Sequence, residues 1–400
     1  MYLRISAGAL QEGIRLIASA ASPRWERGHY IGKLLLQVTT DPAKLTLKTM
    51  NGEFGMNATC VNLGLDTEAG EALVDIDKLA TFLNIREAAT ELVLTLDKRT
   101  TTKTDSVIVP KPTVTIDVLV IEWKTKRKQS FAIKSDTFFL DGFPLRKVPD
   151  LEQGIANNLP SLFQSVAFAA AHDESRPVLS GVYVGVNGLD AQIVAADGFR
   201  LAYYKVTNVG LQDGDYIVPN QALAALCAAL PKTTNTRVLS ALSNNALHVQ
   251  FTTGNWTVLF SASLVAGNFI DFARMLNPEP GCTFAIEQGE LLKKLKFVSA
   301  MATASQGRIA SFTIDEGMME IFVRSDAGTM NTKLPVAELD SDDAVQFFLN
   351  VQLLAEGVRA SPSNTIIVTL PRPKQSPALL FTDPDKKWKY LLMPMEERSL

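Results

Sequence analysis

The chain is poor in the residues and motifs on which most enzymes and metalloproteins depend. It has three cysteines and three histidines in 400 residues, and no two cysteines have the CxxC spacing. It contains no GxxxxGKS/T phosphate loop, GxGxxG turn, HExxH motif or GxSxG elbow. The histidines lie in separate stretches, so their spacing predicts no metal or catalytic site. We expect neither a metal nor a cofactor, and interpret the chain as a scaffold rather than an enzyme.

Long apolar runs are also missing. No run approaches the roughly 18 apolar residues of a membrane helix, and residues 1–6 alternate like a strand instead of forming a signal peptide. Cys60, Cys227 and Cys282 are far apart in the sequence, as expected of small buried hydrophobic residues in a reducing compartment. We therefore expect a soluble, cytoplasmic protein that does not bind membranes.

The overall composition is that of a folded protein. With 46% hydrophobic and 20% charged residues, the chain can build ordinary cores. Its length suits two to four domains. The net charge of −3 argues neither for nor against nucleic-acid binding, because such a function can occupy one face of a protein.

The most informative feature is a pattern that occurs three times. Three turn glycines lie 146 and 130 residues apart: Gly52, Gly198 and Gly328. Three predicted helix openings lie 143 and 130 residues apart: Asp77, Asn220 and Asn350. This period is too long for solenoid units of about 20–50 residues. We therefore predict three similar domains over residues 1–148, 149–281 and 282–400.

Each block predicts the order β-α-β-β-β-α-β-β-β, with two amphipathic helices packed on antiparallel sheet, which is an α+β fold. The first helices are expected over residues 10–21 and 162–171 of blocks one and two. Asp77 is expected to cap the second helix of block one, and Pro219 to lie in the first turn of its counterpart in block two. The final strand is predicted over residues 388–393.

Two polar patches are candidates for function. His172 to Arg176 follows a charge-poor helix, where the cations suit a helix C-terminus equally well. Lys293, Lys294 and Lys296 have no acidic residue between them on a predicted helix. Such a helix could follow a phosphate backbone, although an ordinary solvated face explains it nearly as well.

The C-terminal end is unusually apolar. Residues 391–395 read as a strand that becomes a tail containing Pro394, whereas chain ends are normally polar and frayed. Methionine adapts to varied partners, and two methionines flank this proline. The tail is therefore either packed into its own domain or part of a binding surface.

These segments resemble the bacterial DNA sliding clamp, the β subunit of DNA polymerase III. The resemblance is carried by residues 172–181, 195–202, 216–219, 264–272 and 390–395, with residues 32–38 in block one. It spans the chain in order, most strongly in block two and at the C-terminus, and most weakly over residues 85–145.

The resemblance implies a ring of two copies joined head to tail, with helices around a central hole and sheets outside. Such a ring holds double-stranded DNA without reading its sequence, and the chain would be nucleoid-associated. The implied partners are DNA polymerase, the clamp loader and other proteins with a clamp-binding motif. Its function would be processivity, without catalysis.

The resemblance also implies two sets of site residues. The DNA-facing set is basic: Arg24, Arg27, His172, Arg176, Lys293, Lys294 and Lys296. The partner-peptide groove between blocks two and three is apolar throughout: Leu179, Ala196, Leu201, Ile270, Met275, Leu391, Met393, Pro394 and Met395. This groove would bind peptides with Gln followed by Leu and Phe anchors.

The sequence departs from the family in several places. Ala196 stands where the family usually has Thr, and Ile270 where it usually has Pro. Residues 396–398 extend past the usual end, and the segment 98–133 is atypical. Three hypotheses stay open: a processivity clamp, a clamp paralogue with a specialised partner, and an enzyme with an interdomain site around His172, Asp173 and Arg176.

Overall fold

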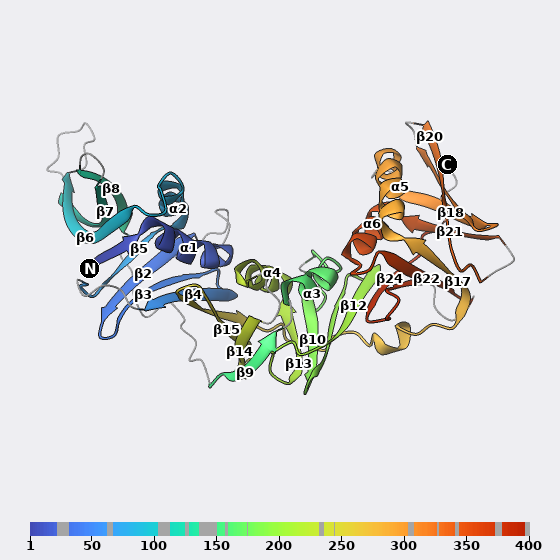
Figure 1. Ribbon diagram of the computed structural model, residues 1–400, viewed down its shortest axis with the longest axis horizontal. Coiled ribbons are helices and arrows are strands. Elements are labelled where there is room, and N and C mark those ends of the chain that lie inside the picture. The colour runs from blue at the N-terminus through green and yellow to red at the C-terminus, as the bar shows by residue number, and fades with distance from the viewer. Residues whose placement is uncertain are drawn as a thin grey trace. The chain divides into compact units, whose positions relative to one another are not determined.

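The computed structural model forms two compact units (Figure 1). It describes residues 1–21, 32–61, 67–102, 113–124, 128–135, 150–156, 159–173, 175–231, 236–243, 245–302, 308–325, 328–340, 344–372 and 378–396. Unit 1 contains Met1–Pro160, Gly210–Gln212 and Gln221–Leu264, and unit 2 contains Ser161–Val209, Asp213–Asn220 and Val265–Leu400.

The elements form three successive repeats. The first contains β1 (Tyr2–Ser6), α1 (Ala7–Ile17), η1 (Ala18–Ala20), β2 (Lys33–Thr40), β3 (Ala43–Met50), β4 (Phe54–Val61), β5 (Gly70–Asp75), α2 (Ile76–Asn84), β6 (Glu91–Thr102), β7 (Thr113–Lys124) and β8 (Lys128–Ser135). The second contains β9 (Glu152–Ala156), α3 (Leu159–Ala167), β10 (Gly181–Asn187), β11 (Asp190–Ala196), β12 (Arg200–Thr207), β13 (Gly214–Pro219), α4 (Asn220–Ala229), β14 (Thr236–Ser243), β15 (Ala246–Thr253) and β16 (Trp256–Ser263). The third follows η3 (Ala273–Met275) and contains β17 (Pro280–Glu287), α5 (Gln288–Met301), β18 (Ile309–Asp315), β19 (Met318–Ser325), β20 (Gly328–Pro335), β21 (Val345–Asn350), α6 (Val351–Ala360), β22 (Thr365–Pro371), β23 (Leu379–Thr382) and β24 (Trp388–Leu392).

The repeated order confirms the α+β class and corrects one detail. In every repeat, four strands separate the two helices, so the prediction of three strands was wrong. The missed strands are β5, β13 and β21, each six residues long and leading directly into the second helix. A short apolar run next to a helix start cannot be told from the helix by periodicity alone.

The starts of the second helices also differ from the prediction. Asp75, not Asp77, caps α2, because its carboxylate accepts the Lys78 N–H at 3.0 Å. Asp77 lies in the first turn, where its charge still suits the helix dipole. Pro219 is the last residue of β13 instead of the first turn of α4. The corrected cap fits the repeat better. Asp75 and Asn220 lie 145 residues apart, which is closer to the 146 residues between Gly52 and Gly198 than the 143 between Asp77 and Asn220.

Other boundaries move by a few residues. The helix expected over residues 10–21 begins at Ala7 and ends at Ile17, followed by η1, and the one expected over residues 162–171 runs over Leu159–Ala167. The final strand ends at Leu392. The atypical segment 98–133 contains the C-terminal end of β6, all of β7 and most of β8, while residues 103–112 and 125–127 lie outside the described part.

The strands form two eight-stranded sheets and two four-stranded sheets, with antiparallel pairing throughout the named ladders. Unit 1 has the order β5-β2-β3-β4-β16-β15-β14-β9, and unit 2 has β13-β10-β11-β12-β24-β23-β22-β17. The four-stranded sheets are β1-β6-β7-β8 and β20-β19-β18-β21. Each large sheet therefore joins strands of two neighbouring repeats, through β4–β16 in unit 1 and β12–β24 in unit 2.

The repeated glycine turn has the same chemistry in the first two repeats. Gly52 and Gly198 have φ of 96° and 95°, which glycine adopts without a steric cost. The residue before each glycine accepts two backbone N–H bonds on its side chain, of 3.1 and 3.0 Å at Asn51 and 2.9 and 3.0 Å at Asp197. These are Asx turns, which explains why Asn or Asp precedes Gly there.

The helices lie on one side of the sheets of each unit (Figure 1), and α2 and α5 also pack on the four-stranded sheets. The first helix of each repeat buries a stripe of apolar residues spaced by three or four positions: Leu10, Ile14 and Ile17 in α1; Leu162 and Val166 in α3; Leu291, Leu295 and Val298 in α5. Ala169, in the turn just after α3, continues the second stripe. This spacing places each stripe on one helix face. Among the described residues, no helix is long and apolar enough to cross a membrane.

Candidate partner site and basic surface

Unit 2 carries an apolar cluster on the sheet face away from its helices. Tyr390 of β24 points toward the helices, because its hydroxyl donates to the Leu353 carbonyl of α6 at 2.9 Å. Successive strand residues point to opposite faces, so the neighbouring Leu391 faces the other way. Leu391 belongs to the apolar cluster.

The cluster combines strands with the segment that leads into the third repeat. Its buried members are Val194, Ala196, Leu201, Tyr203, Leu276, Ala378, Leu380 and Leu391. Its half-buried members are Leu179, Tyr183, Phe269, Phe272, Met275 and Met393. The half-buried residues give the cluster an accessible apolar surface.

The structure brings six of the nine predicted groove residues into this cluster: Leu179, Ala196, Leu201, Met275, Leu391 and Met393. Ile270 is 38% exposed and lies outside the cluster, in the segment that carries Phe269 and Phe272. Pro394 and Met395 are half-buried just after β24. A peptide-binding role for all nine residues stays a prediction.

Sequence reasoning missed the aromatic part of the cluster. The Tyr183 ring lies 5.5 Å from Phe269 and 5.6 Å from Phe272, and Tyr203 lies 6.1 Å from Phe272. The period-two alternation of β10 and β12 could have placed both tyrosines on one sheet face. Burial and a 2.6 Å hydrogen bond that the Tyr183 hydroxyl donates to Asp215 raise the pKa of Tyr183 to about 12.

Lys389 of β24 binds the segment that leads into the third repeat. Its ammonium donates to the Leu276 carbonyl at 3.0 Å and to Asn277 Oδ1 at 2.8 Å. Burial lowers the pKa of Lys389. These bonds hold the chain that carries Met275 and Leu276 over β24.

The apolar tail is anchored by its backbone. The Met393 N–H donates to the Phe199 carbonyl at 2.9 Å, and the Met395 N–H donates to the Phe348 carbonyl at 2.8 Å. The Phe199 side chain is 62% exposed. The tail therefore packs on its own unit, while the half-buried methionine side chains still present apolar surface.

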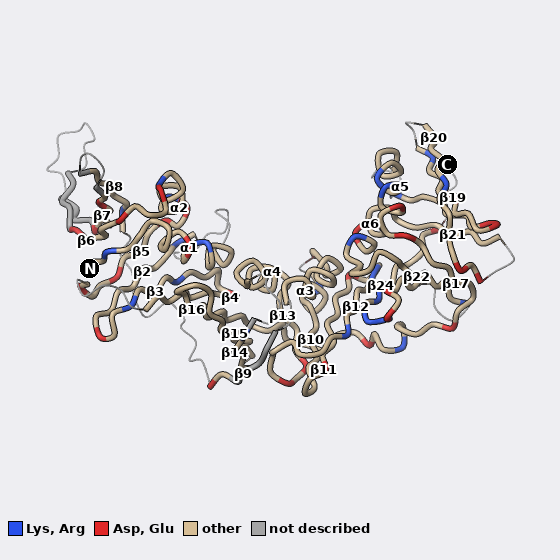
Figure 2. Tube along the Cα trace, in the orientation of Figure 1, with Lys and Arg blue, Asp and Glu red and all other residues tan. Residues whose placement is uncertain are grey.

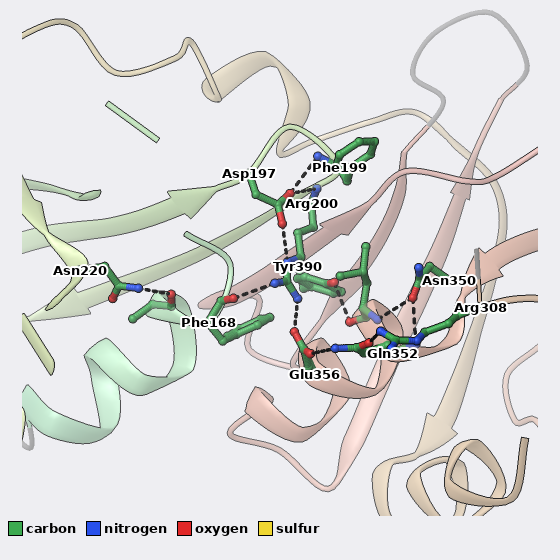
Figure 3. Close-up of polar contacts among 12 residues, drawn as sticks. Phe168, Asp197, Phe199, Arg200, Asn220, Arg308, Asn350, Gln352, Glu356 and Tyr390 are labelled. Carbon is green, nitrogen blue, oxygen red and sulfur yellow. Dashed lines mark hydrogen bonds and ion pairs between the residues drawn. The ribbon is translucent and has the colours of Figure 1, made fainter. Parts of the chain in front are cut away.

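Arg200, the first residue of β12, belongs to the polar network drawn in Figure 3. Its guanidinium donates to Asp197 Oδ2 at 2.9 Å, to Glu356 Oε2 at 2.5 Å and to the Phe168 carbonyl at 2.9 Å. It also lies 5.4 Å from the centre of the Phe168 ring. Arg200 lies in the segment 195–202 that carries the family resemblance, but nothing in the sequence predicts a role for it.

The predicted basic residues occupy separate elements. Lys293, Lys294 and Lys296 lie on α5, where basic residues colour the tube blue (Figure 2). Lys293 and Lys296 are exposed, and Lys294 is half-buried. Lys293 pairs at 2.5 Å with Glu290, one turn earlier, which raises the pKa of Lys293 and lowers that of Glu290. This pair offsets part of the positive charge of the helix.

Of the other predicted basic residues, the structure describes His172 and Arg176. His172 and Arg176 are exposed residues after α3, and Arg24 and Arg27 lie outside the described residues. Asp173 accepts hydrogen bonds from the backbone and hydroxyl of Ser175, and these lower the pKa of its carboxyl group. Such contacts are typical of a turn, and a lowered pKa does not suit an acid or base near neutral pH. The enzyme hypothesis gains no support at this loop.

The described residues form no candidate metal site. Within the ranges that the structure describes, no group of three or more His, Cys, Asp or Glu side chains could hold a metal ion. The three cysteines are buried and unpaired with one another, and burial raises the pKa of each thiol.

The central part of the chain matches a known family. Residues 155–271 match the model of the DNA polymerase III beta subunit, central domain. The resemblance to the bacterial sliding clamp is confirmed. A protein named "Beta sliding clamp" from Streptococcus pneumoniae is 24% identical over 240 residues, which is 59% of this chain and 62% of that protein. Another beta sliding clamp, from Treponema pallidum, is 25% identical over 68% of this chain and 72% of its own length.

The sliding-clamp fold extends beyond the central domain. The DNA polymerase III beta subunit of Thermotoga maritima superposes with a TM-score of 0.80 at 19% identity, over 99% of this chain and 100% of that chain. That of Pseudomonas aeruginosa gives 0.81 at 19% identity, with the same coverage. The sequence match spans less than two thirds of the length of the Streptococcus pneumoniae clamp.

Proposed function

We propose that this chain is a DNA sliding clamp: two copies close into a ring around duplex DNA and tether a replicative polymerase to it. The role is that of an accessory subunit, without catalysis. The single observation that carries the proposal is the way in which neighbouring repeats share their sheets. The family match of the central domain supports the same reading.

The sheet topology leaves two matching edges unpaired. The third strand after the first helix of a repeat pairs with the last strand of the next repeat, as β4 pairs with β16 and β12 with β24. The third repeat offers β20 in the same role, and the first repeat offers β8 as a last strand. Among the described residues, each of these strands ends a four-stranded sheet. Pairing β20 with β8 of a second copy, twice, completes both sheets and closes a dimeric ring.

An exposed phenylalanine supports the same contact. The residues just before the last member of each first-helix stripe are Leu16, Phe168 and Phe297. Leu16 is 2% exposed, and the Phe168 ring packs 5.6 Å from Tyr390. Phe297 is 62% exposed. Leu16 is thus buried and Phe168, in the turn just after α3, is half-buried, whereas Phe297 is open. This difference points to a cover for Phe297 that another copy supplies.

Phe297 lies in the half of α5 that approaches the free edge. Met301, one turn further along α5, reaches strand β20, since a Cβ added at Gly328 would lie 3.5 Å from Met301 Cε. A strand added to β20 would therefore bring its own repeat next to Phe297. Aromatic side chains such as that of Phe297 are enriched at protein–protein interfaces.

DNA binding in this proposal is topological. Exposed lysines such as Lys293 and Lys296 need only offset phosphate repulsion through contacts that do not read bases. A net charge of −3 is compatible with this role, because the enclosing ring prevents dissociation. The predicted contacts of Arg24, Arg27, His172 and Arg176 belong to the same proposal.

The apolar cluster of unit 2 would bind the polymerase and the clamp loader. Leucine and phenylalanine anchors of a peptide gain affinity by leaving water, and Leu179, Met275 and Met393 offer half-buried apolar surface to them. We expect affinities in the micromolar range, as for small transient interfaces.

A processivity assay with the cognate polymerase and clamp loader tests the function. Addition of this protein should lengthen the products of a single binding event. Lack of any effect, with a polymerase whose peptide still binds, would favour the paralogue with a specialised partner. A monomeric mass by light scattering at micromolar concentration would contradict the ring itself.

A further inference from the structure

Arg200 is a buried charge on β12, the strand that also carries Leu201 and Tyr203 of the apolar cluster. Its side chain is 4% exposed, whereas that of its partner Glu356 is 29% exposed. Burial alone would lower the pKa of Arg200, but the bond to Glu356 and the nearby carboxylates hold it above its usual value. A buried charge that keeps its ionised form needs its partners in place, because an unpaired one is strongly destabilising.

One end of this network controls the position of the tail. Asp197 uses one carboxylate oxygen for the Arg200 guanidinium and the other for the N–H groups of Phe199 and Arg200. The Phe199 carbonyl then accepts the Met393 N–H. The position of the tail therefore depends on the turn that Arg200 holds.

The other end is fixed to α6. Glu356 accepts Gln352 Nε2 at 2.9 Å on the oxygen that Arg200 does not use, and Gln352 in turn accepts a hydrogen bond from Arg308 (Figure 3). Helix α6 itself packs tightly on β24, since a Cβ added at Gly357 would lie 2.2 Å from the Tyr390 ring. Helix α6 is thus a rigid support for the Arg200 side chain.

We propose that Arg200 is a positioning residue for the partner site. Tied to α6 through Glu356, it holds the Asp197–Phe199 turn, and through that turn it sets the conformation in which Met393 and Met395 meet a partner peptide. This inference rests on the proposed peptide-binding function. Arg200 itself need not touch the peptide, because its donors are directed to protein acceptors.

The test compares Arg200→Gln, Glu356→Gln and the double variant with wild type in the full chain. The probe is a fluorescent peptide with Gln followed by Leu and Phe, titrated by anisotropy. We expect each single variant to bind about tenfold more weakly, a change of about 1.4 kcal/mol. The double variant should be no weaker than the worse single one, since both changes break one network.

Two further measurements separate positioning from stability. Lys387→Gln removes an exposed ion pair with Asp385 in the same unit, and this control should bind the peptide like wild type. Methyl NMR signals of Met393 and Met395, recorded without peptide, should shift in both network variants. A general loss of stability would not single out these two methionines among the ten in the chain.

The outcomes are distinct. Wild-type peptide affinity and unshifted Met393 and Met395 signals in Glu356→Gln would overturn the inference, even if Arg200→Gln failed to fold. Additive losses in the double variant would also overturn it, since they would mean independent effects. A wild-type protein that binds no such peptide would refute the partner site instead, and the methyl signals would still decide whether Arg200 sets the tail.

Discussion

Replacing Phe297 by alanine should weaken the ring without unfolding the chain. Large aromatic side chains bury about 150–250 Å². Because Phe297 is 62% exposed, the second copy could bury roughly 120 Å² of its side-chain surface. At about 25 cal/mol per Å², and with Cβ retained in alanine, each contact loses about 2–3 kcal/mol. A ring of two copies has two such contacts, so the dissociation constant of the dimer should rise roughly 10³- to 10⁴-fold.

Analytical ultracentrifugation over a concentration series measures this change. Leu189→Ala is a matched control, because Leu189 is 71% exposed at the β10–β11 turn of a sheet that contains neither β8 nor β20. The control should dimerise like wild type, and both variants should unfold at the wild-type temperature. A Phe297→Ala dimer as tight as wild type would refute the assignment of this residue to the contact between copies.

Four other perturbations test separate parts of the account. Changing Lys293, Lys294 and Lys296 together to Glu should weaken DNA retention and reduce its salt dependence; a wild-type salt profile would remove α5 from the DNA surface. Deleting residues 393–400 should abolish peptide binding while the dimer persists, and full-strength binding in a fluorescence titration would contradict the site. Burial would raise the pKa of Glu356, but bonds from Arg200 and Gln352 hold it below its usual value, so its stabilisation is lost as pH falls through that lowered pKa. Wild type should therefore lose more unfolding free energy than Glu356→Gln between about pH 5 and pH 3, and parallel curves would contradict the network. Gly357→Ala should destabilise unit 2 by about 1–3 kcal/mol through overpacking on Tyr390, as a lower melting temperature would reveal.

The repeats could be recognised in the sequence because their turns and helices depend on residues that are close together in the chain. Gly52 and Gly198 recur because a positive φ favours glycine, and the Asn or Asp before each one closes the turn. The helices α1, α3 and α5 could be predicted because apolar residues spaced by three and four positions lie on one helix face. Strands β5, β13 and β21 were missed, since each is only six residues long and its short apolar run leads directly into a helix, so it shows no period of its own. Sheet pairing across repeats, as in β12–β24, depends on contacts far apart in the chain.

The candidate site was only partly predictable. Its aliphatic members came from the family resemblance, and six of the nine meet in the cluster. Tyr183 and Phe272 were not predicted as site residues, because aromatic residues in strands and turns usually belong to an ordinary hydrophobic core. Arg200 was missed because a charged strand residue normally faces water. Its burial depends on Glu356, 156 residues further along the chain.

Retention on DNA of different topology tests the central claim most directly. The protein, loaded on a nicked circular plasmid by its clamp loader, should stay with the DNA through gel filtration at high salt. Linearising the plasmid at a single site should release it, because a ring slides off a free end. Equal retention on circular and linear DNA, or none on circular DNA with an active loader, would contradict the sliding clamp.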